Sequence, residues 1–178
     1  MFILLIIPLT FLFLYTFTND DIFNKFSYLI TSTGYLALIY LVIVLMLPYI
    51  KSKLTFINPR SLGLSTFYLS VLHFSLYAID NNLDIIILQE DLLYRNYIIS
   101  GYIALILFIP MYLTSYDYYK KIIPNWRKIH KIIYIIYILI LLHIYFIIKA
   151  DYLYLFIFIM VFFVSITLKL LNLKKKNE

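Results

Sequence analysis

Six long runs of the sequence contain no aspartate, glutamate, lysine or arginine, and these runs constrain the fold more than any other feature. A helix that crosses a bilayer needs about 20 apolar residues, and occasionally as few as 17. In lipid every backbone N–H and C=O must be hydrogen-bonded within the protein, which a helix achieves alone. The sequence therefore predicts an all-α integral membrane protein, a bundle of six transmembrane helices over residues 1–19, 26–50, 61–79, 96–116, 132–148 and 152–168.

Composition supports this prediction and excludes several other classes of protein. Of the 178 residues, 64% are apolar and 13% charged, whereas soluble domains contain about 45–50% and 25% respectively. There is no cysteine, which excludes disulfide scaffolds and cysteine-ligated metal sites. The first run lacks a basic start and a small-residue cleavage site, so we expect a retained anchor rather than a signal peptide. We expect one membrane domain over residues 1–178.

The basic residues predict the orientation of the bundle, because short cytoplasmic loops are enriched in lysine and arginine. The other side of the membrane receives few basic residues and most of the acidic ones. Both termini are therefore predicted to be cytoplasmic, and the net charge of +6 suits a membrane surface better than nucleic acid. The residues that mark the cytoplasmic side are Lys51, Lys53, Arg60, Lys120, Lys121, Arg127, Lys128, Lys131, Lys169, Lys174, Lys175 and Lys176.

Two histidines are predicted to lie at the same depth in the membrane, where ionisable side chains are candidates for function. His73 precedes Asp80 by about 10 Å along its helix, and His143 precedes Lys149 by about 9 Å, at 1.5 Å per residue. His130 lies about 20 Å lower on the same helix as His143, at the cytoplasmic boundary. Gly34, Gly63 and Gly101 stand near the starts of three spans, where we expect helices to pack closely.

A pair of imidazoles at one depth suits a haem held from both faces. Without cysteine, and with the four methionines scattered, two histidines are the natural axial ligands. The alternative is a pair of neutral histidines, each hydrogen-bonded to a carbonyl or hydroxyl group of another helix. For His130, which has basic neighbours at Lys128 and Lys131, the alternative is an ordinary interfacial histidine. The spacing of the three residues leaves these alternatives open.

Several short motifs follow one another in a recognisable order. They are PRSLGL at 59–64, YLSVLHFSLY at 68–77, YRNYI at 94–98 with Gly101, Pro110 with LTS at 113–115, WRKIHK at 126–131 with Tyr134, and His143 downstream. Together they resemble the MsrQ (YedZ) haem-binding subunits of the ferric-reductase-like transmembrane superfamily, over about residues 33–146. In the family's R-P-Y-I-x-x-G motif, Asn96 replaces the usual proline.

This resemblance implies a function for the chain. MsrQ subunits of the bacterial inner membrane take electrons from quinol or from a cytoplasmic flavin reductase. They pass them through haem b to MsrP, a periplasmic molybdenum enzyme that repairs oxidised methionine in envelope proteins. The chain would then be a multi-pass electron-transfer subunit with no catalytic residue of its own, dependent on MsrP as its partner and binding no nucleic acid.

The resemblance also implies cofactors and binding residues. His73 and His143 would hold an outer haem, and His130 a second, inner haem, giving one or two haems b. FMN is described for some members, although the sequence contains no dedicated flavin motif. Arg60 and Arg95 would contact haem propionates or a flavin phosphate, or would simply extend to lipid headgroups.

Two other functions remain open at this point. One is a stand-alone ferric or quinone reductase of the same superfamily, which would need no molybdenum partner. The other is a non-redox transporter component or scaffold, in which the histidines are structural. Proteolysis is disfavoured, because His73 is not part of an HExxH motif. On the outer side, the acidic segment 80–91 contains a short apolar stretch, which predicts an interfacial helix and a docking surface for the partner.

Overall fold

The computed structural model describes residues 2–50, 58–149 and 152–177, and every element within these ranges is a helix. The long apolar runs form long helices, as the sequence predicts, and the segments between them form short ones. The helices are α1 (Phe2–Thr18), α2 (Lys25–Ile50), α3 (Pro59–Asp80), α4 (Ile85–Tyr94), α5 (Asn96–Leu113), α6 (Asp117–Ile122), α7 (Trp126–Ile129), the 3₁₀ turn η1 (His130–Ile132), α8 (Ile133–Ile147) and α9 (Leu153–Asn177).

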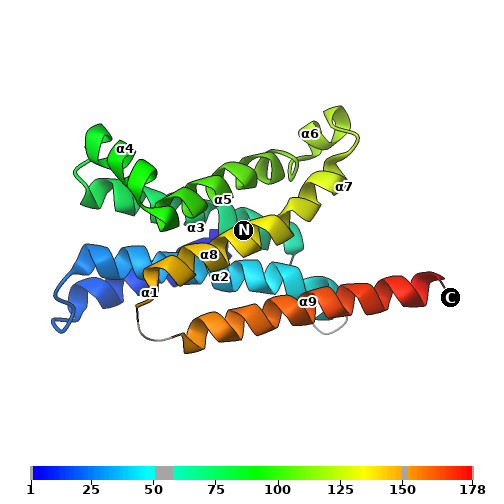
Figure 1. The fold of residues 1–178 in the computed structure, drawn as a ribbon, viewed down its shortest axis with the longest axis horizontal. Helices are drawn as coiled ribbons and strands as arrows, with labels where there is room; N and C mark the ends of the chain where they lie inside the picture. Colours follow the sequence, from blue (N-terminus) through cyan, green and yellow to red (C-terminus); the bar gives the residue numbers. More distant parts are fainter. Residues whose placement is uncertain (1, 51–57, 150–151, 178) are drawn as a thin grey trace.

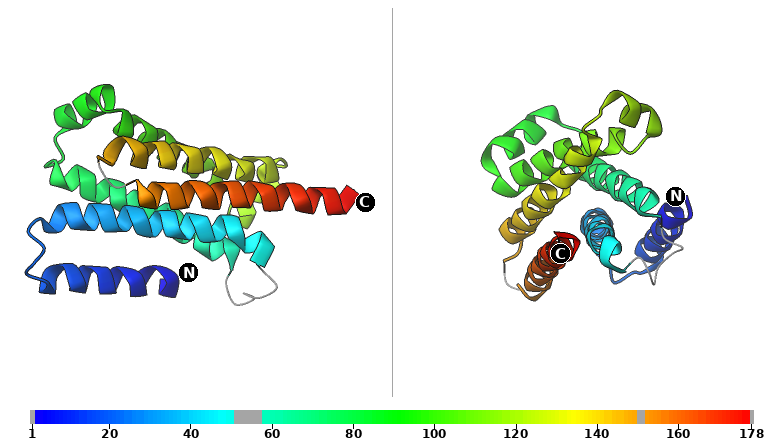
Figure 2. Two further views of the ribbon diagram at one scale, coloured as in Figure 1. Left: turned by 60° about the horizontal axis from the view of Figure 1, so that its bottom comes forward. Right: turned by 90° about the vertical axis from the view of Figure 1, so that its right-hand side faces the viewer.

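The long helices run along one axis and form a bundle (Figures 1 and 2). Two helix pairs make up its centre, since α2 packs along α3 and α5 packs along α8. Helix α1 lies against α2 and α3, and α9 lies against α8 and α2. We call the end with α4, where α2 begins, the α4 end. We call the end with α6 and α7, where α2 ends, the α6 end.

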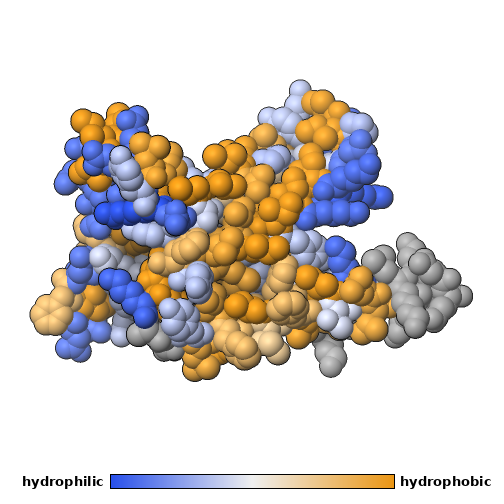
Figure 3. All heavy atoms as spheres, viewed as in Figure 1, coloured by the Kyte–Doolittle hydropathy of each residue, from blue (hydrophilic) through white to orange (hydrophobic). Residues whose placement is uncertain are grey.

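Five helical segments are long and apolar enough to cross a membrane, namely 25–49, 59–80, 96–113, 126–147 and 153–172. The sixth apolar helix, 3–18, is shorter. Figure 3 shows hydrophobic side chains over the middle of the molecule and hydrophilic ones gathered toward its ends. The predicted all-α membrane bundle with six apolar helices is thus confirmed. The connection between the fifth and sixth predicted spans, residues 149–151, lies partly outside the described residues, and the basic residues Lys51 and Lys53 lie wholly outside them.

Several helix boundaries differ from the predicted ones, among them the end of α9, which lies at Asn177 rather than at residue 168. The fourth predicted span ends at Leu113 rather than at residue 116, because Thr114 caps α5 and the chain turns there. The fifth predicted span begins earlier than residue 132, since α7 and η1 continue into α8. The helical path therefore starts at Trp126 and includes His130. A search for runs without charged residues misses this extension, because Arg127, Lys128 and Lys131 lie within it.

Helix α4 is the short helix that the acidic segment predicts. The turn before it places Asn82 and Leu83 in the left-handed region, each with φ of 56°. Asp84 then caps the helix, its carboxylate accepting a hydrogen bond of 2.8 Å from the amide of Ile86, a typical N-cap interaction. Only Arg95 separates α4 from α5, so the chain folds back at once over the α4 end of the bundle.

The buried core lies where α2, α5, α8 and α9 meet. Tyr137 of α8 is fully buried, and its ring stacks on Phe162 of α9 with centroids 5.2 Å apart. Its hydroxyl donates to the carbonyl of Phe158 at 3.0 Å, which satisfies the one polar atom of this side chain. Leu41 of α2 and Phe108 of α5 complete this cluster from the other side. The core fixes the relative positions of α2, α5 and α8, three of the four helices that surround the site; α3 is the fourth.

Candidate functional site

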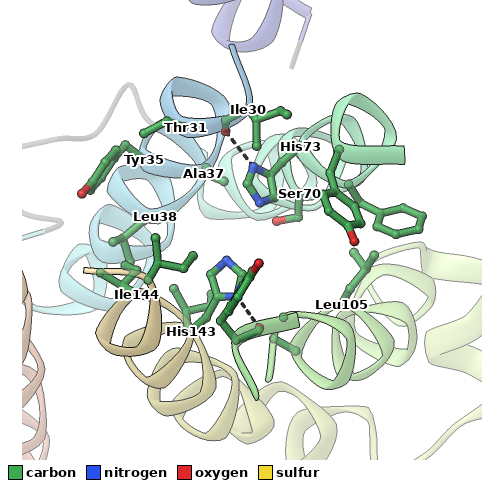
Figure 4. A pocket seen from close by; sticks show the side chains of 18 of the residues that line it. Ile30, Thr31, Tyr35, Ala37, Leu38, Ser70, His73, Leu105, His143 and Ile144 are labelled. Atoms are coloured by element: carbon green, nitrogen blue, oxygen red, sulfur yellow. Dashed lines mark hydrogen bonds between the residues drawn. The ribbon is translucent and has the colours of Figure 1, made fainter. Parts of the chain in front are cut away.

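The structure brings His73 of α3 and His143 of α8 together, far apart though they are in the sequence. Their ring centroids are 6.2 Å apart and the ring planes meet at 83°. Figure 4 shows the two imidazoles facing each other across a cavity, each with one nitrogen turned outward in a hydrogen bond. The prediction that the two side chains lie at one depth is confirmed.

Each imidazole is oriented by a main-chain carbonyl of the neighbouring helix. The Nδ1 atom of His73 lies 2.8 Å from the carbonyl oxygen of Ile30, on α2. The Nδ1 atom of His143 lies 2.6 Å from the carbonyl oxygen of Tyr97, on α5. A carbonyl oxygen can only accept, so both Nδ1 atoms carry the proton and both Nε2 atoms keep a free lone pair. This is the tautomer in which Nε2 can bind a metal.

A glycine one helical turn beyond each carbonyl makes room for the ring. A methyl group added at Gly34 would lie 3.1 Å from the His73 ring, and one added at Gly101 would lie 3.0 Å from Nδ1 of His143. Each carbonyl and its glycine are four residues apart on one helix, so they share a helix face. Gly34 and Gly101 therefore provide space for the imidazole rings of His73 and His143, and not only for the close packing of helices. Gly63 differs, because nothing lies within 4 Å of a methyl group placed there.

The cavity between the imidazoles, which we call the histidine-pair cavity, has a volume of about 710 Å³. Small-molecule sites in proteins commonly measure about 300–1,000 Å³. Its wall is mainly apolar, with side chains such as Leu38, Leu105 and Ile144, and His73 and His143 supply its basic nitrogens. Tyr77, Tyr97 and Lys149 line it as well.

The donor set and spacing fit a haem held between two histidines. A metal–nitrogen bond to histidine is about 2 Å long, and the nitrogen lies about 1 Å from the ring centre, so a shared metal separates two ring centres by about 6 Å. The observed 6.2 Å agrees with this value. No cluster of three or more His, Cys, Asp or Glu side chains that would hold a bare metal ion occurs among the described residues.

His130 does not join the pair. Its Nε2 atom lies 3.1 Å from Oγ1 of Thr114, and this hydroxyl already donates to the carbonyl of Pro110 at 2.7 Å. The Nε2 atom, which is free in the other two histidines, is therefore engaged by a side chain here. The ring also contacts Trp126 edge to face, with centroids 5.7 Å apart. His130 thus differs from His73 and His143 in the ring nitrogen that the protein engages, and the described residues include no second histidine near it.

The two arginines from the sequence analysis lie at opposite ends of the molecule. Arg60 pairs with Asp117 at 3.1 Å, at the α6 end, and does not line the histidine-pair cavity. Arg95 pairs with Asp91 at 2.9 Å and donates to the hydroxyl of Tyr97 at 2.9 Å, at the α4 end. The hydrogen bond to Tyr97 raises the pKa of Arg95. Only Arg95 is therefore connected to the cavity, and the connection is indirect, through Tyr97.

Asp91 is a site residue that the sequence analysis did not identify. Among the described residues it is the one acidic side chain that is buried, 6% exposed, and it accepts from the hydroxyl of Tyr77 at 2.5 Å as well as from Arg95. Because Tyr77 stands one turn beyond His73 on α3, Asp91 ties α4 to the helix that carries His73. The sequence signal was weak, since Asp91 sits in a segment with several exposed carboxylates.

Comparison with known proteins identifies the same segment. A profile of the family described as ferric reductase like transmembrane component matches residues 30–141, close to the predicted 33–146. The match includes His73 and His130 and ends shortly before His143. No solved structure matches the chain.

Curated relatives are similar to this chain over part of their length. A protein of Brucella anthropi is 34% identical over 107 residues, which cover 57% of this chain and 49% of the relative. A protein of Brucella ovis is 36% identical over 78 residues, covering 43% and 36%. Both are named protein-methionine-sulfoxide reductase heme-binding subunit MsrQ. The chain therefore spans about half the length of the first relative and about a third of the second.

Proposed function

The chain belongs to the ferric-reductase-like transmembrane family, and from this membership we propose that it is a haem b electron-transfer subunit of a protein-methionine-sulfoxide reductase system. In this proposal it lies in the bacterial inner membrane with both termini in the cytoplasm. It takes electrons from quinol or from a cytoplasmic flavin reductase. It delivers them to MsrP, the periplasmic molybdenum enzyme that repairs oxidised envelope proteins.

The observation that carries this proposal is the pair of imidazoles whose free nitrogens face one cavity. His73 and His143 would hold the haem iron through Nε2, one from each face. The carbonyls of Ile30 and Tyr97 fix each ring by accepting from Nδ1, which also makes Nε2 a stronger electron donor. Such hydrogen bonds commonly change metal affinity by about 10- to 100-fold.

A haem with both axial positions filled carries single electrons and leaves no position for oxygen or substrate. The surrounding residues serve this role by excluding water, since the cavity wall is mainly apolar. Tyr97 and Lys149, which line the cavity, would bind the propionates, and Arg95 would act through the hydroxyl of Tyr97. Arg60 takes no part in this site.

We further propose that the chain holds one haem. An inner haem at His130 would have to displace the hydrogen bond between Nε2 and Thr114, and it would need a second ligand, whereas the described residues place no other histidine nearby. FMN, which the family resemblance also implies, has no dedicated motif in this sequence. Fluorescence of the supernatant after denaturation would detect FMN directly.

The absorption spectrum of the purified protein tests the proposal. We expect a b-type Soret band that shifts on reduction with dithionite, and one haem per polypeptide in a pyridine haemochrome assay. A colourless protein from cells supplied with haem would rule out the haem site and favour a structural role for the histidines. Reconstitution with MsrP tests the partner, because electron delivery to iron or quinone without MsrP would instead indicate a stand-alone reductase.

A further inference from the structure

The two histidines that face the cavity belong to different helix pairs of the bundle. His73 lies on α3, which packs along α2, and His143 lies on α8, which packs along α5. The Nδ1 hydrogen bond of each ring stays within its own pair, because the acceptors are on α2 and α5 respectively. The angle and the distance between the two rings therefore depend on the contacts that join the α2–α3 pair to the α5–α8 pair.

Asp91 joins the two helix pairs at the α4 end. Its carboxylate uses both oxygens, since Oδ2 accepts from the hydroxyl of Tyr77 at 2.5 Å and Oδ1 accepts from Nε of Arg95 at 2.9 Å. Tyr77 is on α3, in the α2–α3 pair. Nη1 of Arg95 donates in turn to the hydroxyl of Tyr97 at 2.9 Å, and Tyr97 is on α5, in the α5–α8 pair.

Each branch of this network ends beside one of the two histidines. Tyr77 follows His73 by four residues, so the two side chains share a face of α3, and both line the histidine-pair cavity. Tyr97 supplies the carbonyl that accepts from Nδ1 of His143 at 2.6 Å. Its ring also lies edge to face with the ring of His143, with centroids 6.2 Å apart. Hydrogen bonds thus link one carboxylate to a neighbour of each ring.

Anchoring of α4 alone does not account for a buried carboxylate at this position. Burial of a charge costs free energy that its partners only partly return, and apolar contacts would hold a short helix at least as well. Arg95 is half-exposed, so Asp91 is the more buried member of the ion pair. The buried member is also the one that contacts the cavity wall directly, through Tyr77. This placement indicates a role in the site.

We propose that Asp91 is a positioning residue for the two histidines. It holds Tyr77 directly and Tyr97 through Arg95, and so keeps the two imidazole planes at a fixed angle, which is 83° here. Its negative charge lies one hydrogen bond from the cavity wall, where it favours the ferric over the ferrous state of a bound haem. This inference rests on the haem site proposed above.

Two variants break the network, and each has a matched control at the same end of the molecule. Asp91→Asn removes the buried charge, whereas Glu90→Gln removes an exposed charge from the neighbouring residue. Tyr77→Phe removes the hydroxyl that donates to Asp91, whereas Tyr94→Phe removes the hydroxyl of an exposed side chain. Each full chain is purified in mild detergent with its haem. Haem content, the EPR spectrum of the ferric state and the reduction potential are then measured.

The EPR spectrum reports the positioning of the rings. The largest g value of a low-spin ferric haem depends on the angle between the planes of its two axial imidazoles. We therefore expect this signal to shift or broaden in Asp91→Asn and in Tyr77→Phe, and to stay unchanged in both controls.

The reduction potential reports the charge of Asp91. It should rise chiefly in Asp91→Asn, since that variant alone removes a buried charge. We expect the ratio of ferrous to ferric haem at a fixed potential to rise about tenfold, which corresponds to about 59 mV for one electron. Glu90→Gln should give a much smaller rise, because solvent screens an exposed charge.

The outcomes distinguish this inference from the proposed function on which it rests. An unmodified chain without haem would overturn both. Haem in the unmodified chain, with EPR spectra of Asp91→Asn and Tyr77→Phe equal to those of the controls, would overturn the positioning role alone. A raised potential in Asp91→Asn without any change in the EPR signals would reduce Asp91 to a nearby charge. If Asp91→Asn does not fold, the EPR spectrum of Tyr77→Phe decides, because that variant keeps the ion pair with Arg95.

Discussion

The histidine-pair cavity and a second cavity of about 480 Å³ at the α6 end, which His130 lines, share two wall residues, Thr66 and Phe108. Their histidines nevertheless differ in the ring nitrogen that is hydrogen-bonded. In the first cavity Nδ1 of each ring is tied to a carbonyl and Nε2 is free. In the second, Nε2 of His130 is tied to a hydroxyl. A candidate ligand is distinguished from a structural histidine by which ring nitrogen is hydrogen-bonded, more than by the burial or depth of the side chain.

The largest expected effect comes from removing a histidine of the pair. His73→Ala or His143→Ala leaves one imidazole to hold the proposed haem, so we expect haem per polypeptide to fall about tenfold or more. His130→Ala is the matched control and should keep its full haem content. Haem content measured by pyridine haemochrome would contradict the comparison if all three variants lost it equally.

The next effect tests the space that glycine provides. Gly101→Val places carbon atoms against the His143 ring, where a single methyl group would already approach to 3.0 Å. We expect the ring to turn away from the carbonyl of Tyr97 and haem retention to fall by about tenfold. Gly63→Val is the control, because space is open there. Equal haem content in the two variants would show that Gly101 has no such role.

A smaller effect is expected at the mouth of the histidine-pair cavity. Asp91→Asn leaves Arg95 without its anion and weakens the bond to Tyr77, at a cost of about 1–3 kcal/mol in the free energy of unfolding. Glu90→Gln removes the same charge from an exposed neighbour and should change stability by less than about 0.5 kcal/mol. Unfolding in mixed micelles would measure both variants. Equal costs would argue against a buried network at Asp91.

Thr114→Val tests the contact of His130 at the α6 end. It removes the hydroxyl that is hydrogen-bonded to Nε2 of His130, and we expect a loss of about 1 kcal/mol in the free energy of unfolding with no change in haem content. A drop in haem as large as that of His73→Ala would place His130 in the haem site after all. The Soret absorbance per chain reports this directly.

The smallest effect concerns pH. Hydrogen bonds from Lys120 and then from Arg60 lower the pKa of Asp117. A lowered pKa means that the interaction stabilises the fold above about pH 4 and is lost as pH falls through the lowered value. We expect a slight decrease in Tm over that interval that is absent from Asp117→Asn and reduced by salt. A decrease of the same size in Asp117→Asn would assign it to other carboxylates.

The sequence predicted the bundle well because apolar runs of this length have few alternatives in lipid. It also predicted that His73 and His143 stand at the same height, since height follows from residue count along a straight helix, but it left open whether the two rings face each other. It did not predict the ring nitrogen each histidine uses, because the acceptors at Ile30 and Tyr97 are main-chain atoms without a side-chain signature. Nor did it identify Asp91, whose burial depends on how α4 folds back.

The role of His130 was hard to predict for another reason. Its helix begins at Trp126, within a run of basic residues that hydrophobicity assigns to a loop. The hydroxyl that engages it belongs to Thr114, which the sequence analysis identified only as part of a motif. The contact between Thr114, at the end of α5, and His130 depends on the path of the segment that connects them, which contains α6. The hydrophobic periodicity of the sequence does not predict the path of such a segment.

The carbonyls that orient the two imidazoles have a consequence for how this protein tolerates mutation. A carbonyl at position 30 or 97 is retained by any substitution that keeps the helix intact, which excludes proline. The side chains at these two positions can therefore be exchanged without removing either acceptor. For the orientation of the two rings, the side chains that cannot be replaced are the two histidines and the two glycines beside them.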